Sequence, residues 1–404
     1  MKKSRISYLF ILPYVALFFI FVVLPVAVSL VLSFAAFNVL EPAGTHWHKY
    51  KWVGIAGCYL LMMFYTTVAG WMLAYVPKFA SGQFVGADSQ ATSAVFDAML
   101  ASPVECVFWM VVVCVVSILI CSLGVQKGVE RITKAMMLAL LAILGVLVVR
   151  ALTLPGAADG VAFYLLPDFS KIFGSPDMFF EAAYAAMGQA FFSLSITGSG
   201  MIVYGAYLKK DADIPGASLR TAFFDTLAAM LSAVAIIPAV FAYGLDVARG
   251  PSLMFLTLPA VFQQMPMGQL FAVFFFLSVF FAGITSLINM FEAVVESWQS
   301  HFNLNRKLAV LLCSAITLGV GLFLEAEPNV GQWMDFITIQ VVPIGAVLGA
   351  ISIYYVLGWS KLRKELETGR QKPLSRAFGP VGKYVYVPLT ILVVILGFVF
   401  HGIG

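Results

Sequence analysis

Stretches of about 20 mostly apolar residues recur along this chain, and their recurrence constrains the fold more than any other feature. Each stretch is long enough to cross the hydrocarbon core of a bilayer as an α-helix. Charged residues make up 11% of the 404 residues, against roughly 25% in a soluble domain, so they are too few to cover a water-facing surface. The sequence therefore predicts an all-α, polytopic membrane bundle. Ten segments are predicted, near residues 7–36, 52–76, 105–123, 135–153, 178–207, 218–244, 269–300, 307–324, 332–358 and 384–402.

Lysine and arginine are distributed unequally between the predicted loops. Fifteen of them follow the third, fifth, seventh and ninth segments, and four lie in the loops on the opposite side. Because cytoplasmic loops carry an excess of Lys and Arg, the first set is predicted to face the cytoplasm. The stretches 77–104 and 245–268 are then predicted to face outward.

The first segment does not fit this pattern. Basic residues both precede and follow residues 7–36, so one span cannot keep both ends in the cytoplasm. The segment is either a re-entrant or interfacial helix, or a span whose orientation is imposed by the rest of the bundle. We interpret residues 1–50 as an atypical hydrophobic N-terminal segment, separate from residues 51–404.

Sequence signatures of enzymes and of nucleic-acid binding are absent. The five cysteines form no C-x-x-C pair and the four histidines have no metal-ligand spacing. No P-loop, dinucleotide-binding fingerprint, zinc-protease motif or nucleophile elbow occurs. The net charge of +4 is small and is concentrated on one side of the predicted membrane. We predict that the chain is neither an enzyme nor a nucleic-acid-binding protein.

The fifth segment contains an unusual run of small polar residues. Glycine, serine and threonine crowd positions 193–200, within the stretch 188–200. Such residues disfavour a continuous helix, and unwound backbone in a membrane can hold a cation and an anionic solute group. The run is equally compatible with a close-packing seam of small residues between helices.

Oxygen-bearing side chains also gather in the seventh segment, within residues 281–292. Thr285, Ser286 and Asn289 are three or four residues apart and share one helix face. Hydroxyls beside a backbone carbonyl such as that of Ala282 offer oxygen ligands to a hard, small cation. Ordinary hydrogen bonding between helices explains the same pattern equally well.

Asp225, near the start of the sixth segment, is the third candidate. A carboxylate that faces a bundle interior is costly unless it meets a cation. The alternative is a residue at a helix terminus, close to water. Glu292 and Glu296, one turn apart on the seventh segment, are interpreted as a polar helix face.

Six short motifs occur in a fixed order between Lys51 and the C-terminus. They lie in residues 51–71, 127–131, 158–169, 188–200, 256–264 and 281–286. In this order they resemble the third helix, the loop after the fourth helix, the outer loop before the sixth helix, the broken sixth helix, the outer capping loop and the eighth helix of the neurotransmitter:sodium symporter family. The resemblance is to its bacterial amino-acid transporters and covers about seven-eighths of the chain.

The resemblance implies roles for individual residues. Ser193 and Asp225 match ligands of the family's first sodium site, and the second sodium site is matched by Ala282, Thr285 and Ser286. The substrate-binding positions are matched by Tyr65, Phe192, Ser193, Ser195 and Met290. The outer gate is matched by Gln189 and Asp335. The carboxylate of Asp225 implies that chloride is not required, because it supplies the negative charge itself.

The N-terminal residues depart from the family. Its first helix carries a G-x-x-N-x-x-R-F-P signature and supplies ligands to both sodium sites and to the substrate, and no such motif occurs here. Residues 6–37 instead resemble the first helix of a sugar-type ABC permease. Thr197 stands where the broken helix usually has glycine, and Ser300 where the inner gate usually has an acid. The resemblance implies a transporter fold of inverted five-helix repeats whose first repeat is truncated.

These observations predict sodium-coupled symport of an amino acid, or a similar small solute, across the cytoplasmic membrane by alternating access. The alternative is a non-transporting, truncated homologue that acts as a membrane scaffold or as a partner-requiring subunit. The missing ligands motivate this alternative. Without the family's first helix, the second sodium site keeps about three of about five oxygen ligands, and moving sodium from water into that remainder should be unfavourable. An ABC permease is the least supported option, because no ATPase-coupling motif follows residue 50. The sequence leaves a homodimer open.

Overall fold

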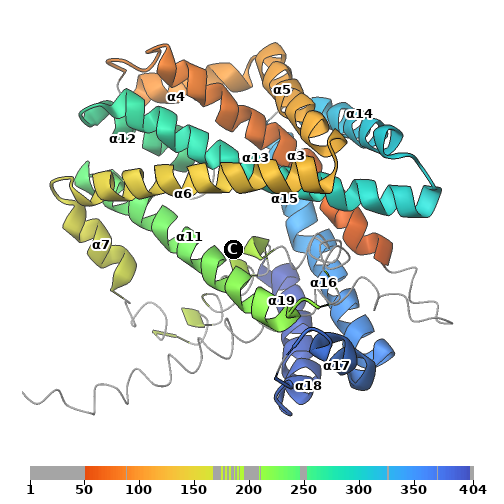
Figure 1. Ribbon diagram of the computed structural model, residues 1–404. Coiled ribbons are helices and arrows are strands. Elements are labelled where there is room, and N and C mark those ends of the chain that lie inside the picture. The colour runs from red at the N-terminus through yellow and green to blue at the C-terminus, as the bar shows by residue number, and fades with distance from the viewer. Residues whose placement is uncertain are drawn as a thin grey trace, which may run out of the picture. The chain divides into compact units, whose positions relative to one another are not determined.

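The computed structural model describes residues 51–87, 89–166, 211–245, 253–324, 327–370 and 372–400, together with a few positions between 174 and 209 (Figure 1). Every regular element within these residues is a helix. This is expected of a chain in lipid, because the hydrocarbon offers no hydrogen bonds and the backbone must pair its own N–H and C=O groups.

The chain divides into two compact units. Unit 2 covers residues 59–168 and 226–334, and unit 1 covers residues 1–58, 169–225 and 335–404. The elements of unit 2 are α3 (Lys51–Ala80, from Tyr59 onward), α4 (Ser89–Leu100), α5 (Pro103–Ser122), the π-helical turn η3 (Val125–Glu130), α6 (Arg131–Leu152), α7 (Ala157–Leu165), α11 (Ile214–Ala242, from Thr226 onward), the π-helical turn η4 (Leu253–Thr257), α12 (Leu258–Gln264), α13 (Gly268–Phe302), α14 (Arg306–Leu324) and α15 (Glu327–Asp335, up to Met334).

Unit 1 holds the first residues of α3 and of α11 and the C-terminal elements. Those elements are the π-helical turn η5 (Phe336–Val341), α16 (Val342–Ile351), the π-helical turn η6 (Ser352–Leu357), α17 (Trp359–Glu367), α18 (Phe378–Val381), the π-helical turn η7 (Gly382–Tyr386) and α19 (Val387–Phe400).

Eight helices in the described residues are long and apolar enough to cross a membrane. They correspond to eight of the ten predicted segments, with ends that differ by a few residues. The predicted segment 7–36 and most of 178–207 lie outside the described residues. The stretches 77–104 and 245–268, predicted as outward loops, contain the short helices α4 and α12.

Several helix ends follow from local sequence. The Ser102 hydroxyl accepts a hydrogen bond from the Glu105 backbone N–H at 3.4 Å, and Pro103 occupies the first position of α5. Serine caps and a first-turn proline both favour a helix start. The long helix α13 ends at Asn303, whose φ of 52° is left-handed. Asparagine tolerates this conformation better than most residues, which allows the chain to turn sharply into α14.

The core of unit 2 is rich in aromatic side chains. Tyr75, Phe79, Phe84, Phe255 and Phe276 are almost completely buried. The rings of Phe79 and Phe84 stack with centroids 4.1 Å apart, and the Tyr75 hydroxyl donates to the Phe255 carbonyl at 3.2 Å. A buried tyrosine needs such a partner for its hydroxyl. The contacts connect α3 to η4 and α13.

Hydroxyl side chains inside the helices bond to their own backbone. Thr66, Ser117, Ser314, Thr317 and Thr390 each donate to the carbonyl four residues earlier, at 2.8–2.9 Å. This back-bonding satisfies a polar group where water is absent.

Gly160 of α7 marks a close approach to α11. A Cβ at this position would lie 2.6 Å from the Pro238 Cα and 3.0 Å from the Ile237 carbonyl oxygen, both of them backbone atoms. Gly160→Ala is expected to lower stability by about 1–3 kcal/mol, because neither helix can yield without moving its neighbours. The measurement is the thermal unfolding midpoint of the purified protein in detergent.

Gly145 of α6 provides the matched control for this substitution. A Cβ there would meet no atom within 4 Å. Gly145→Ala is expected to leave stability unchanged or raise it by up to about 1 kcal/mol, through helix propensity alone. Equal midpoints for the two variants would contradict the close approach.

In unit 1, α17 packs against neighbouring helical segments with two leucine side chains. Leu362 and Leu366 are completely buried and pack in a cluster with Ile353, Tyr354 and Tyr386. The opposite face of α17 carries charged residues. This amphipathic pattern places the helix along the surface of the bundle and not across the membrane.

Glu367 joins the end of α17 to the loop that follows it. Its Oε1 accepts hydrogen bonds from the Leu374 backbone N–H and from the Arg363 Nε, both at 2.9 Å. These bonds, led by the one from Leu374, hold the pKa of Glu367 below its ordinary value. The bonds favour the ionised form, so their contribution to stability is present above the unfolded-state pKa and is lost as pH falls through the lower, folded-state pKa.

Acidification is therefore expected to loosen the loop after α17. Limited proteolysis of the purified protein should cut residues 368–377 faster at pH 3.5 than at pH 7, and Glu367→Gln should show the faster cleavage already at pH 7. Glu365→Gln is the control, because Glu365 accepts neither bond. Identical cleavage rates for wild type and Glu367→Gln at pH 7 would contradict this role for Glu367.

Candidate functional site

A serine hydroxyl and a carboxylate meet in unit 1. The Ser193 Oγ lies 2.8 Å from Oδ1 and 2.7 Å from Oδ2 of Asp225, which lies on α11. A hydroxyl has one proton and can donate it to one oxygen at a time. The group therefore presents three close oxygens, one unit of negative charge and unused lone pairs, which is the chemistry that a small hard cation binds.

Asp225 does not lie at a helix terminus. The helix α11 begins at Ile214, so Asp225 is 11 residues, or about 16 Å, inside it. The helix starts early because Asp213 accepts a bond from the Gly216 N–H at 3.2 Å and Pro215 follows at the start of the helix. The sequence alternative of a residue at the helix terminus is wrong, and Asp225 is half-buried.

A second oxygen group lies in unit 2, within one turn of α13. The Ala282 carbonyl accepts hydrogen bonds from the Thr285 Oγ1 at 3.0 Å and from the Ser286 Oγ at 3.2 Å. Thr285 is 5% exposed, and its hydroxyl also lies 3.9 Å from the Met137 sulfur of α6. The turn gathers three oxygens with no formal charge, as the shared helix face predicted.

Four of the five residues predicted to bind substrate lie within the described residues, and one of them is Ser193, whose contact is given above. Tyr65 is half-buried on α3 and its ring meets that of Phe64 edge-on at 5.7 Å, and Met290 is half-buried on α13. Both belong to unit 2. Phe192 is half-buried beside Ser193 in unit 1, and Ser195 lies outside the described residues.

The two predicted gate residues are both exposed. Gln189 is exposed in unit 1. Asp335, the last residue of α15, is also exposed and forms no ion pair with any residue that the structure describes.

Sequence reasoning missed a buried ion pair. Glu292 of α13 is 0% exposed, and its two oxygens accept from Nη1 and Nη2 of Arg306 at 3.0 and 2.6 Å. The same guanidinium donates through Nε and Nη2 to the Cys121 carbonyl at the end of α5, at 2.9 and 2.7 Å. The predicted polar face is therefore wrong for Glu292.

The physical reason for this correction is the turn after α13. Asn303 ends that helix, and three residues later Arg306 starts α14 and reaches back over the last turns of α13. A guanidinium can bind a carboxylate with two hydrogen bonds and still satisfy a backbone carbonyl. A glutamate with apolar neighbours on both sides in the helix, followed by an arginine just past the turn, is a signal that could have predicted the pair.

The comparisons with known proteins agree on one family. The model of the sodium:neurotransmitter symporter family matches residues 98–401. The chain belongs to this family. The sodium-dependent transporter YhdH of Bacillus subtilis, which is uncharacterized, is 32% identical to this symporter-family chain over 374 residues, covering 89% of this chain and 81% of YhdH. A sodium-dependent transporter of Haemophilus influenzae is 29% identical, covering 88% of this chain and 80% of that protein.

A solved structure resembles the symporter-family chain along most of its length. It is the crystal structure of MhsT in complex with L-phenylalanine, which has a TM-score of 0.80 and 26% sequence identity and covers 96% of this chain and 90% of MhsT. The chain is thus a multi-pass membrane protein of a transporter family and is not an enzyme. The predicted resemblance to this family is confirmed.

Proposed function

We propose that this chain is a sodium-coupled symporter that moves an amino acid across the cytoplasmic membrane by alternating access. Family membership supports this proposal, because the relatives are named sodium-dependent transporters and MhsT was crystallised with L-phenylalanine. The observation that carries the proposal is the contact between Ser193 and both oxygens of Asp225. An oxygen-only group with one negative charge, half-buried in an apolar bundle, is costly unless it binds a cation.

Two groups of residues are proposed to bind sodium. Ser193 and Asp225 form the first group, and Ala282, Thr285 and Ser286 form the second. Binding at the first group would neutralise the carboxylate, and the hydroxyl would then turn its lone pairs to the ion. The second group would hold the ion only through hydroxyl and carbonyl dipoles, without a charged ligand. We therefore expect it to bind sodium more weakly than the first group.

The residues proposed to bind the solute are Tyr65, Phe192, Ser193, Ser195 and Met290. Aromatic rings and a thioether suit an apolar side chain, whereas hydroxyls suit a carboxylate or an ammonium group. Ser193 would serve both the ion and the solute, which gives a direct route for coupling their affinities. Gln189 and Asp335 are proposed to act at the outer gate.

The proposed architecture is the inverted-repeat fold of the family, with residues 51–404 as the transport domain. The excess of Lys and Arg after the third, fifth, seventh and ninth predicted segments supports a cytoplasmic location for those loops. Chloride is proposed to be dispensable, because the carboxylate of Asp225 carries the charge that an anion would otherwise supply.

Binding of labelled amino acids to the purified full chain tests the proposal. A mixed pool is incubated with protein in sodium gluconate, sodium chloride and potassium chloride. We expect binding in both sodium salts, to the same extent, and at least tenfold less binding in potassium. No sodium-stimulated binding from a folded, monodisperse sample would refute symport and favour the non-transporting alternative. Binding in sodium chloride alone would refute the chloride proposal while leaving symport in place.

A further inference from the structure

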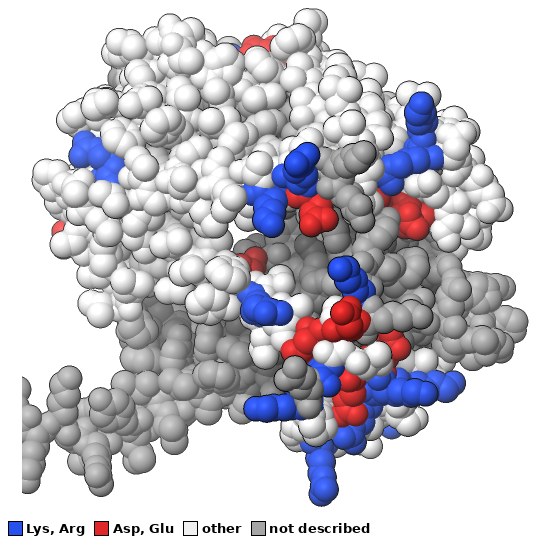
Figure 2. All heavy atoms as spheres, in the orientation of Figure 1, with Lys and Arg blue, Asp and Glu red and all other residues white. Residues whose placement is uncertain are grey.

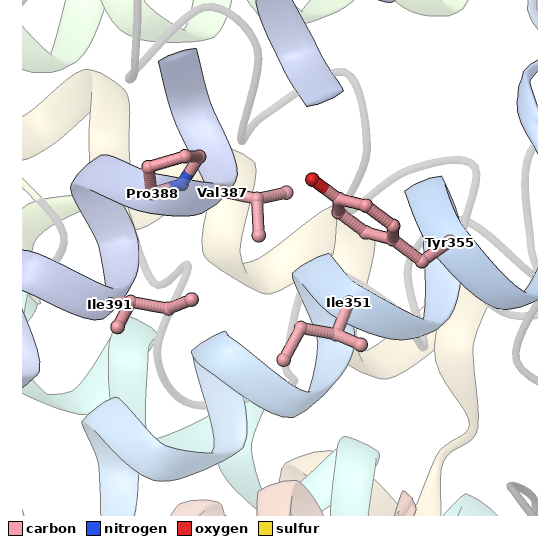
Figure 3. A pocket seen from close by; sticks show the side chains of 5 residues that line it. All are labelled: Ile351, Tyr355, Val387, Pro388 and Ile391. Atoms are coloured by element: carbon pink, nitrogen blue, oxygen red, sulfur yellow. The ribbon is translucent and has the colours of Figure 1, made fainter. Parts of the chain in front are cut away.

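An open apolar groove lies in unit 1, on the side of α16 and η6 that faces α19. It has a volume of about 420 Å³ and is lined by Ile351, Tyr355, Val387, Pro388 and Ile391. Figure 3 shows these side chains pointing toward one another from the two helical segments. The volume falls in the usual range of small-molecule sites, about 300–1,000 Å³. A site with this lining suits a hydrocarbon chain.

A π-helical turn lies in one wall of the groove and another lies directly before the second wall. The π-helical turn η6 supplies Tyr355, and η7 directly precedes Val387 at the start of α19. The wider π-helical turn shifts side chains out of the register of a regular helix and is frequent at functional sites. Pro388 adds a position without a backbone N–H.

A lysine stands at one end of this groove. The Lys383 ammonium lies 4.9 Å from the Tyr355 ring centroid and 5.6 Å from that of Tyr384, and the Tyr355 hydroxyl donates to the Lys383 carbonyl at 3.0 Å. Within the described residues, no carboxylate is within ion-pair distance of this ammonium. Aromatic faces hold the cation in place but leave its N–H groups able to bind an anion.

The sequence places this lysine beside the end of a predicted membrane segment. It directly precedes the predicted segment 384–402, and the rings of Tyr355 of η6 and Tyr384 of η7 lie against its ammonium. Tyrosine is enriched at lipid headgroup depth. Ile391 is eight residues beyond Lys383, so the groove extends about 12 Å from that level along α19. A lipid has this layout, with a charged head at the surface and an acyl chain below it.

The charge around the groove indicates which lipid. Residues 359–383 contain seven Lys or Arg residues and two Glu residues, and Figure 2 shows Lys and Arg, with Asp and Glu among them, over this part of unit 1. Anionic lipids concentrate beside such a segment. A second copy of the chain fits less well, because a two-fold interface here would bring the same basic segments together.

We propose that this groove is a binding site for an anionic phospholipid, with one acyl chain between η6 and α19 and the phosphate bound by Lys383. The exposure of the lining agrees, since the side chains of Tyr355 and Ile391 are 50% and 37% exposed. The site is independent of the proposed sodium and solute residues.

Native mass spectrometry of the purified full chain tests this assignment. The protein is titrated with phosphatidylglycerol and with phosphatidylcholine of the same acyl chains. We expect wild type to bind phosphatidylglycerol about fivefold more tightly, and Lys383→Gln to lose that preference. Ile391→Trp, which fills the groove, should reduce the binding of both lipids. Lys372→Gln removes the same charge from the loop and should behave as wild type.

Three outcomes would overturn the proposal. Equal losses for Lys383→Gln and Lys372→Gln would indicate a diffuse basic surface and no defined site. Unchanged binding by Ile391→Trp, with an unaltered unfolding midpoint, would exclude the groove. A dimer in the wild-type spectrum that Ile391→Trp dissociates would make this face an interface between copies.

Discussion

Asp225→Asn is expected to raise the sodium concentration needed for half-maximal solute binding by about 30-fold or more. The change keeps the size of the side chain and removes its charge, while Ser193 still lies beside it. Removing one partner of a close, partly buried charge interaction costs about 2–5 kcal/mol, and 2 kcal/mol corresponds to roughly 30-fold. The measurement is binding of the labelled amino acid identified by the pool experiment, titrated with sodium at constant ionic strength.

Asp213→Asn is the matched control on the same helix. Asp213 lies at the start of α11, where it accepts from Gly216 and pairs with Arg370 at 3.3 Å. It bears the same charge as Asp225 but contacts none of the proposed ion ligands. We expect its sodium dependence to match wild type. If Asp225→Asn does so too, the assignment of Asp225 as a sodium ligand is wrong, whatever the protein transports.

Arg306→Met is expected to lower stability by about 3–5 kcal/mol, the largest effect on folding that we predict. The substitution leaves the carboxylate of Glu292 completely buried without its guanidinium and also removes two hydrogen bonds to the Cys121 carbonyl. An uncompensated buried charge is far more costly than a lost surface pair. The measurement is the thermal unfolding midpoint in detergent at a fixed scan rate.

Two further variants separate the buried charge from other causes. Glu292→Gln combined with Arg306→Met should recover part of the loss, because no charge then remains buried. Arg363→Met makes the same change in the partly exposed pair with Glu367 and should lower the unfolding midpoint far less than Arg306→Met does. A double variant as unstable as Arg306→Met alone would mean that lost packing, and not the buried charge, explains the effect.

The candidate site shows how far local sequence could predict the ion ligands. Thr285, Ser286 and Asn289 were predicted to share one helix face beside the Ala282 carbonyl. The structure bonds the first two hydroxyls to that carbonyl, because helical periodicity alone determines contacts within one turn. The contact between Ser193 and Asp225 spans 32 residues, so it followed from the family resemblance and not from spacing. Asp225 was also open to interpretation as a terminal residue until the start of α11 at Ile214 was known.

The sequence by itself determined that this chain is a helical membrane bundle, and where eight of its helices lie. Those properties depend on hydrophobicity summed over about 20 residues, and a lipid solvent leaves a helix as the only open choice for each segment. Only the tertiary structure decided that Glu292 is buried against Arg306 and that η6 and α19 line an open groove beside Lys383. These features depend on which side chains meet after a turn or across neighbouring helices, and such contacts leave no periodic pattern in the sequence.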